Sequence, residues 1–191
     1  MYPQIRSFIF LDRLQPQTMC YLGTWIKGTL PRAGDAAQII EVAPGLDIEP
    51  LTDVALKSAH VAAGILIVER HFGYLELHGP PASVRAAAGF VLDDLGASAT
   101  DAMQPEILAS RIVSRLDHQH AFLVNRNKIG SMVIAGESLF VLEVQPASYA
   151  ILAVNEAEKA ADVKVVDYRM VGATGRVYLA GREADVRQAA E

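Results

Sequence analysis

Few residues of this 191-residue chain could do chemistry, and their spacing does not join them into a reactive site. His118 and His120, in the run DHQH, would lie on one side of a strand, where their two imidazoles could bind a metal ion. The corresponding place in the first half of the chain holds Pro16 and Thr18, and no matching ligand cluster appears there. We therefore favour a surface role for these histidines and expect neither a metal nor a cofactor.

Two neighbouring carboxylates, Asp93 and Asp94, are the other candidates for acid–base chemistry. They would fall on a helix, where adjacent residues point to different faces, so they do not form a dyad. The chain also lacks a P-loop, a GxGxxG fingerprint, an HExxH zinc motif and a GxSxG nucleophile elbow. We predict that the protein is not an enzyme.

Composition narrows the classes of function further. The formal net charge is −5 and the isoelectric point about 5.5, which disfavours nucleic-acid binding because that requires a basic face. No run approaches the roughly 18 consecutive apolar residues of a membrane span, and the segment Met1–Gln4 begins neither a signal peptide nor a transit peptide. The lone cysteine, Cys20, cannot form an internal disulfide. We expect a cytoplasmic protein with no nucleic-acid or membrane partner.

The chain repeats itself at one constant interval. Matching residues lie 102 positions apart without gaps, and they include Lys57 and Lys159, Arg13 and Arg115, Gln17 and Gln119, Gly73 and Gly175, and Pro44 and Pro146. Solenoid repeats run at about 20 to 50 residues, so this interval has the size of a domain. We predict a tandem duplication, with domains at 1–100 and 101–191 joined through the small and polar segment Gly96–Glu106.

Each copy has the same predicted order of elements, which is that of an α+β fold. Apolar alternation predicts strands at 7–14 and 37–42, a third strand at 20–28 (CYLGTWIKG), and a hairpin made of 65–72 and 73–79. Helical spacing of apolar residues predicts helices at 50–63 and 81–96. The second copy reaches Glu191, opposite Gly89 of the first.

Two corresponding runs show the repeat most fully: AQIIEVAPGLDIEPLTDVALKSAHV in copy one and LFVLEVQPASYAILAVNEAEKAADV in copy two, each a strand, a linker and a helix ending in AxKxA. A strand, a glycine tip, a strand ending in glycine and a helix beginning with Val-Arg follow in both copies. This repeated pattern resembles the BMC-domain shell proteins of bacterial microcompartments. The arginine-bearing strands IFLDRLQ and IVSRLDH come first in each copy, which is similar to the circularly permuted tandem branch.

The resemblance implies a structural function. Each copy would be a permuted BMC domain, an α/β sandwich related to the ferredoxin-like fold, and three chains would close a pseudohexameric ring. The ring would tile a shell with further copies and other BMC shell proteins, and small metabolites would pass through a central pore. The resemblance places at the pore Glu69, Arg70, His71, Phe72 and Gly73, with Val171, Gly172, Ala173, Thr174 and Gly175. It places at the ring's edge Lys57, Lys159, Arg13 and Arg115.

Each of these residues also has an ordinary structural explanation. A lysine near a helix end interacts favourably with the helix dipole, a surface arginine forms weak salt bridges, and the segment Glu69–Gly73 could be a simple polar turn. The alternative function is a small-molecule-binding regulatory module of two α+β domains. Size in solution separates the two, because a shell component should be a trimer or a stacked pair of trimers.

Overall fold

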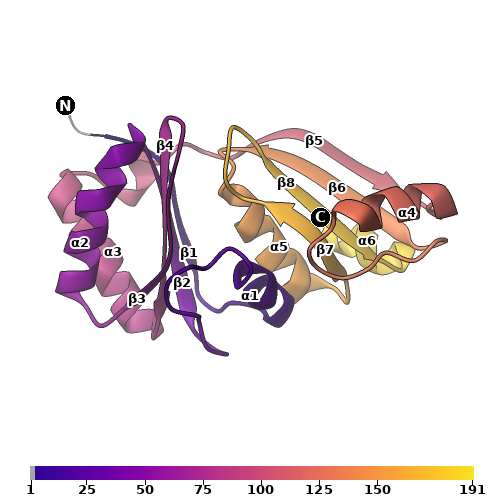
Figure 1. The fold of residues 1–191 in the computed structure, drawn as a ribbon, viewed down its shortest axis with the longest axis horizontal. Helices are drawn as coiled ribbons and strands as arrows, with labels where there is room; N and C mark the ends of the chain where they lie inside the picture. Colours follow the sequence, from indigo (N-terminus) through magenta and orange to yellow (C-terminus); the bar gives the residue numbers. More distant parts are fainter. Residues whose placement is uncertain (1–2) are drawn as a thin grey trace. The chain divides into compact units, whose positions relative to one another are not determined.

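The computed structural model describes residues 3–191, which form two compact units (Figure 1). Unit 1 contains the described residues up to Leu14 together with Trp25–Gln104, and unit 2 contains Gln15–Thr24 together with Pro105–Glu191. Residues 1–2, part of the segment considered above for a leader peptide, lie outside the described residues. Within 3–191, no helix has both the length and the apolar character needed to cross a membrane.

Unit 1 is a four-stranded antiparallel sheet with helices on one face. The strands β1 (Gln4–Leu11), β2 (Ala36–Ala43), β3 (Ala62–Glu69) and β4 (Phe72–Gly79) lie in the order β1-β2-β4-β3. The helices α2 (Ile48–Ser58) and α3 (Pro81–Leu95) bury their apolar stripes against Leu75 and Leu77 of β4. Short 3₁₀ turns at Gly45–Asp47 and Ala99–Asp101 complete the unit.

Unit 2 repeats this architecture. Its strands β5 (Glu106–Val113), β6 (Ser138–Gln145), β7 (Lys164–Arg169) and β8 (Gly175–Gly181) lie in the order β5-β6-β8-β7, accompanied by α4 (His118–Asn127), α5 (Tyr149–Ala160) and α6 (Glu183–Ala189). The match extends to detail: the bulge between Ala63 and Ile65 recurs between Val165 and Asp167, and the bonds before Pro44 and Pro146 are both cis. The predicted duplication and α+β fold are confirmed.

The third predicted strand is wrong. Instead of a strand at 20–28, the chain forms helix α1 (Pro16–Leu22), with Pro16 in the first turn, where its missing N–H costs nothing. The segment DHQH was also expected in a strand, but it lies at the start of helix α4, so its two histidines do not share the side of a strand. Among residues 3–191 no group of three or more His, Cys, Asp or Glu could hold a metal ion.

Candidate pore and edge sites

The hairpin of unit 1 ends in a tight charged turn. Glu69 of β3 pairs with Phe72 of β4, and only Arg70 and His71 join them, with Arg70 at a positive φ of 55°. The Arg70 side chain is 87% exposed, and its Nε lies 3.7 Å from Oε1 of Glu69. An exposed pair of this kind contributes little to stability, so the two charges are free to exchange partners.

The equivalent tip of unit 2 is longer and carries small side chains. Strand β7 ends at Arg169, and residues 170–174 form a loop in which Gly172 adopts a φ of 127°. The Thr174 hydroxyl donates a 2.7 Å hydrogen bond to Glu143, and Arg176 approaches the same carboxylate at 3.4 Å. These contacts, first Thr174 and then Arg176, hold the pKa of Glu143 below its ordinary value. One end of this loop is therefore tied down by a charge-assisted contact.

Two glycines expected at the hairpin tips lie elsewhere. Gly73 and Gly175 are buried within β4 and β8, where a Cβ would collide with the carbonyl oxygens of Gly45 and Ala147. Their lack of a side chain lets the strand pack against the preceding 3₁₀ turn or helix start. This packing accounts for both glycines within their own units, and their place at a pore stays a prediction.

The candidate edge lysines occupy matching places near helix ends. Lys57 of α2 forms a 2.6 Å pair with Asp53, and Lys159 of α5 forms a 2.9 Å pair with Glu156. The Lys57 side chain is 75% exposed and that of Lys159 is 29% exposed. Both pairs lie within one helix.

The sequence pattern predicts that the candidate edge arginines lie in strands, but the structure places them in loops. Strand β1 ends at Leu11 and β5 at Val113, so Arg13 and Arg115 both fall in the loops that follow, where they are exposed. Arg115 adopts a positive φ of 49°. The loop residues turn the chain from the sheet into helices α1 and α4.

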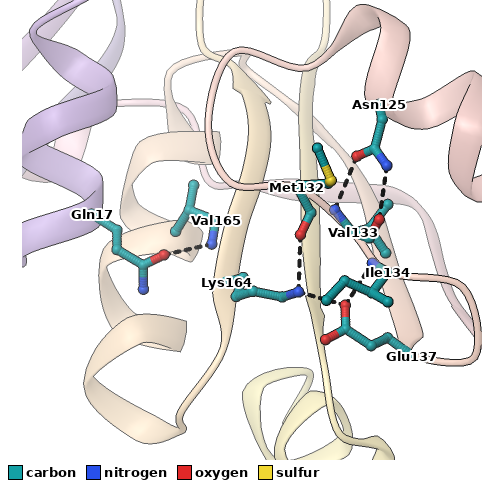
Figure 2. A network of polar contacts seen from close by, with 8 residues as sticks. All are labelled: Gln17, Asn125, Met132, Val133, Ile134, Glu137, Lys164 and Val165. Carbon is teal, nitrogen blue, oxygen red and sulfur yellow. Dashed lines mark hydrogen bonds and ion pairs between the residues drawn. The ribbon is translucent and has the colours of Figure 1, made fainter.

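Sequence reasoning missed the docking of α1 on unit 2. The Gln17 side chain reaches strand β7, where it accepts a hydrogen bond from the Val165 N–H (Figure 2). It also donates a hydrogen bond to the carbonyl of Val163, just before that strand. Tyr21 donates to the buried Asp167. The signal was present: proline in the first turn, followed by Thr18, Tyr21 and Leu22 at helical spacing, is typical of a short amphipathic helix.

The comparisons with known proteins agree with this architecture. Residues 5–101 match the family described as the CsoS1D N-terminal domain, and residues 138–191 match the BMC domain. The chain is 44% identical to the carboxysome shell protein CcmP of Synechococcus elongatus, over 96% of this chain and 86% of that protein. It is 43% identical to the carboxysome shell protein CsoS1D of Hydrogenovibrio crunogenus, over 98% of this chain and 92% of that protein.

Two solved structures are also closely similar. The fused permuted hexameric shell protein MSM0275 from the RMM microcompartment superposes with a TM-score of 0.97 at 77% identity, covering 98% of this chain and 93% of that one. The double ringed trimeric shell protein MSM0271 from the same microcompartment gives 0.94 at 40% identity, covering 98% and 92%. These relatives are named as shell proteins, which confirms the prediction of a structural rather than a catalytic role. The chain belongs to the tandem, permuted BMC-domain shell proteins of bacterial microcompartments, of the CsoS1D and CcmP type.

Proposed function

We propose that three copies of this chain close a ring of six units that tiles a microcompartment shell and carries a pore at its centre. The observation that supports this most directly is the equivalence of the two units, which extends to strand order, bulge position and cis prolines. Units so alike can occupy equivalent places around one axis. The similar protein MSM0271 is described as double ringed and trimeric, which favours the same threefold assembly here.

The two hairpin tips would then line the pore unequally. Unit 1 contributes Glu69, Arg70, His71 and Phe72, and unit 2 contributes the small residues Val171, Gly172, Ala173 and Thr174. Three charged tips would alternate with three small ones around the axis. The weak, exposed Glu69–Arg70 pair supports a gate, because its charges can pair across the axis in one state and along the wall in another.

The edge residues would join rings to one another and to other BMC shell proteins. Lys57 and Lys159 occupy equivalent helix ends, and Arg13 and Arg115 occupy equivalent exposed loops. The planar guanidinium can bind backbone carbonyls across a seam between rings. Small metabolites would pass through the central pore.

The test of this function is assembly. Light scattering of the purified chain should give a mass of three chains, or of six for stacked rings, and electron microscopy at high concentration should show flat sheets with threefold rings. A monomer, or a dimer that does not build to a threefold particle, would overturn the proposal.

A further inference from the structure

Helix α1 comes from the first repeat of the sequence but belongs to unit 2, where it packs against α5 and β7 of the second repeat. Its first amides, at Gln17 and Thr18, donate to the Glu158 carboxylate of α5 at 2.8 and 2.9 Å, which caps the helix. The ring of Tyr21 packs on Tyr168 of β7, with centroids 4.1 Å apart. Strand β7 and helix α5 together form the receptor of unit 2.

Helix α4 is the equivalent of α1 in the second repeat, and its outer face is bare. Thr18 and Tyr21 are buried, but the residues 102 positions later, His120 and Leu123, are exposed, Leu123 by 59%. The helix is nevertheless held in place. Its inner face packs through Ala121 in the core of unit 2.

The segment that follows α4 fixes the direction of the helix. The amide of Asn125 forms two hydrogen bonds with the backbone of Val133, at 2.7 and 2.9 Å. The ammonium of Lys164, on β7, donates to the Met132 carbonyl at 2.9 Å and pairs with Glu137 at 2.5 Å (Figure 2). Helix α4 therefore presents its apolar outer face from a rigid support rather than from a loose loop.

Unit 1 carries an exposed surface at the positions that form the receptor of unit 2. The equivalent of Tyr168, which is fully buried, is Leu66, which is 41% exposed. The equivalent of Met170, which is 3% exposed, is Val68, which is 38% exposed. Glu158 is replaced by Leu56, also exposed. These three apolar residues form the receptor of unit 1, on strand β3 and helix α2.

The differences between the two helices match the differences between the two receptors. Where α1 begins at Gln15, which provides no side-chain cap, α4 begins at Asp117, which accepts a 2.8 Å bond from the Gln119 N–H. This bond holds the pKa of Asp117 below its ordinary value. Helix α4 thus carries its own cap, and its counterpart receptor, with Leu56 in place of Glu158, supplies none.

A second pair of residues also differs between the two repeats in a coordinated way. The buried polar pair of α1 and its receptor, Tyr21 and Asp167, corresponds to Leu123 and Ile65, so both members become apolar together. In addition, α1 leaves a groove of about 370 Å³ beside Cys20 and residues 129–131. Phe122, 59% exposed, stands at the position of Cys20 and adds a large apolar side chain to the outer face of α4.

We propose that α4 of each chain docks on the receptor of unit 1 of a second copy of this chain, in the geometry in which α1 docks on β7 and α5. Leu123 lies against the exposed Leu66, and Gln119 repeats the bridge of Gln17 by bonding the backbone of Val61 and Ala63. This interface rests on the proposed ring and names the surfaces that close it. It is heterologous, so a ring results when the third chain meets the first.

Cross-linking tests the interface directly. In a Cys20→Ser background, the pair Leu123→Cys and Leu66→Cys should react with a short bis-maleimide to give covalent dimers and trimers of the chain on a denaturing gel. Mixing the two single variants should give dimers that contain one of each. As a matched control, Tyr21→Cys with Tyr168→Cys should cross-link only within a chain, because α1 and β7 touch within one unit.

A substitution adds a second readout. Leu123→Asp should convert the assembly to single chains with unchanged circular dichroism, whereas Phe90→Asp, at an exposed apolar residue of α3, should leave it intact. Wild-type chains that never exceed a monomer would count against the ring itself. A wild-type trimer that survives Leu123→Asp, together with no cross-link in the Leu123→Cys, Leu66→Cys variant, would overturn the interface alone.

Discussion

The guanidinium of Arg6 lies over the ring of Phe72, 3.9 Å from its centroid, and connects the charged hairpin tip to the core of unit 1. The Arg6 Nε forms a 2.6 Å ion pair with Glu41, which is fully buried. The side of the tip that contains Phe72 is therefore anchored by a cation–π contact, while Arg70 on the other side is exposed. Movement of the tip should be confined to Arg70 and His71, the two residues that join the strands.

Removing one partner of the Arg6–Glu41 pair should destabilise unit 1 strongly. Glu41→Leu leaves the Arg6 charge buried without its acceptor, and the free energy of unfolding should fall by about 3–5 kcal/mol. The double variant Arg6→Met, Glu41→Leu should recover most of that loss, because it buries no charge. Urea unfolding at one fixed protein concentration measures both. Equal losses in the single and double variants would show that the charge pair is not the cause.

The exposed pair at the tip should control the pore rather than the fold. Glu69→Ala with Arg70→Ala should shift the balance of open and closed rings without changing the mass of the assembly or its stability, since an exposed pair contributes only about 0–1 kcal/mol. Particle classes in electron micrographs report the balance. The matched change in unit 2, Val171→Ala, should leave it unaltered. An unchanged balance in the double variant would remove Glu69 and Arg70 from the gate.

Charge reversal at the candidate edge should separate folding from tiling. Lys57→Glu or Lys159→Glu should leave the ring intact and abolish extended sheets, because each reversal places a carboxylate where the seam needs a donor. Arg115→Glu should behave in the same way. Arg111→Glu, the same change of charge on strand β5, serves as the control and should still form sheets. Loss of the ring itself in Lys159→Glu would place this residue inside the ring rather than at its edge.

Acid should loosen the tip of unit 2 before it affects the rest of the unit. The pKa of Glu143 is lower in the folded chain than its ordinary value of 4.5, so its contact with Thr174 stabilises the loop above that pH. The contact should be lost as the pH falls below about 4.5 and through the lower folded pKa. Carboxyl chemical shifts and amide exchange at residues 170–174 would report this. Thr174→Val should move the titration of Glu143 upward; an unmoved titration would contradict the assignment.

Alkali should weaken the docking of α1. Burial, followed by the hydrogen bond to Asp167, raises the pKa of Tyr21 above its ordinary value of about 10. The stabilisation is thus complete below pH 10 and is lost as the pH rises towards the folded pKa. Tyr21→Phe should remove this dependence and cost about 1–3 kcal/mol at neutral pH, because Asp167 loses a buried donor. Tyrosinate absorbance during denaturation follows both; a Tyr21 that titrates at its ordinary pKa would contradict the contact.

Much of each unit could be predicted from the sequence because its signals are local. The strands β1, β2 and β4 follow apolar alternation, and α3 follows the spacing of Val84, Ala87, Val91 and Leu95, all of which are buried. The constant interval between the copies then allowed each prediction to be checked against its counterpart. Agreement between the copies did not guarantee the bounds, because the strands predicted through Arg13 and Arg115 end at Leu11 and Val113.

The failures have one physical origin, which is packing between segments far apart in the sequence. Tyr21, Trp25 and Ile26 favour strands by type, but Tyr21 and Leu22 are buried as parts of a helix that rests on unit 2. Likewise, Gly73 and Gly175 look like turn residues and instead make room for the carbonyls of Gly45 and Ala147. In each case the contacting residues lie far away in the sequence, so the local pattern does not reveal them.

Helix α1 is capped by Glu158 of α5, whereas helix α4 is capped by its own Asp117. This difference affects which surface each helix can pack against. Helix α1 placed against a first-repeat surface would find Leu56 and keep two uncapped amides, whereas α4 placed against α5 would bring Asp117 towards Glu158 to compete for the same N–H groups. Each exchanged pairing of helix and surface is thus disfavoured. Helix α1 would lack an acceptor for its first amides, and helix α4 would bring two carboxylates together. In the proposed ring, neighbouring units would therefore alternate between the two repeats, and joining both repeats in one chain would supply them in equal numbers.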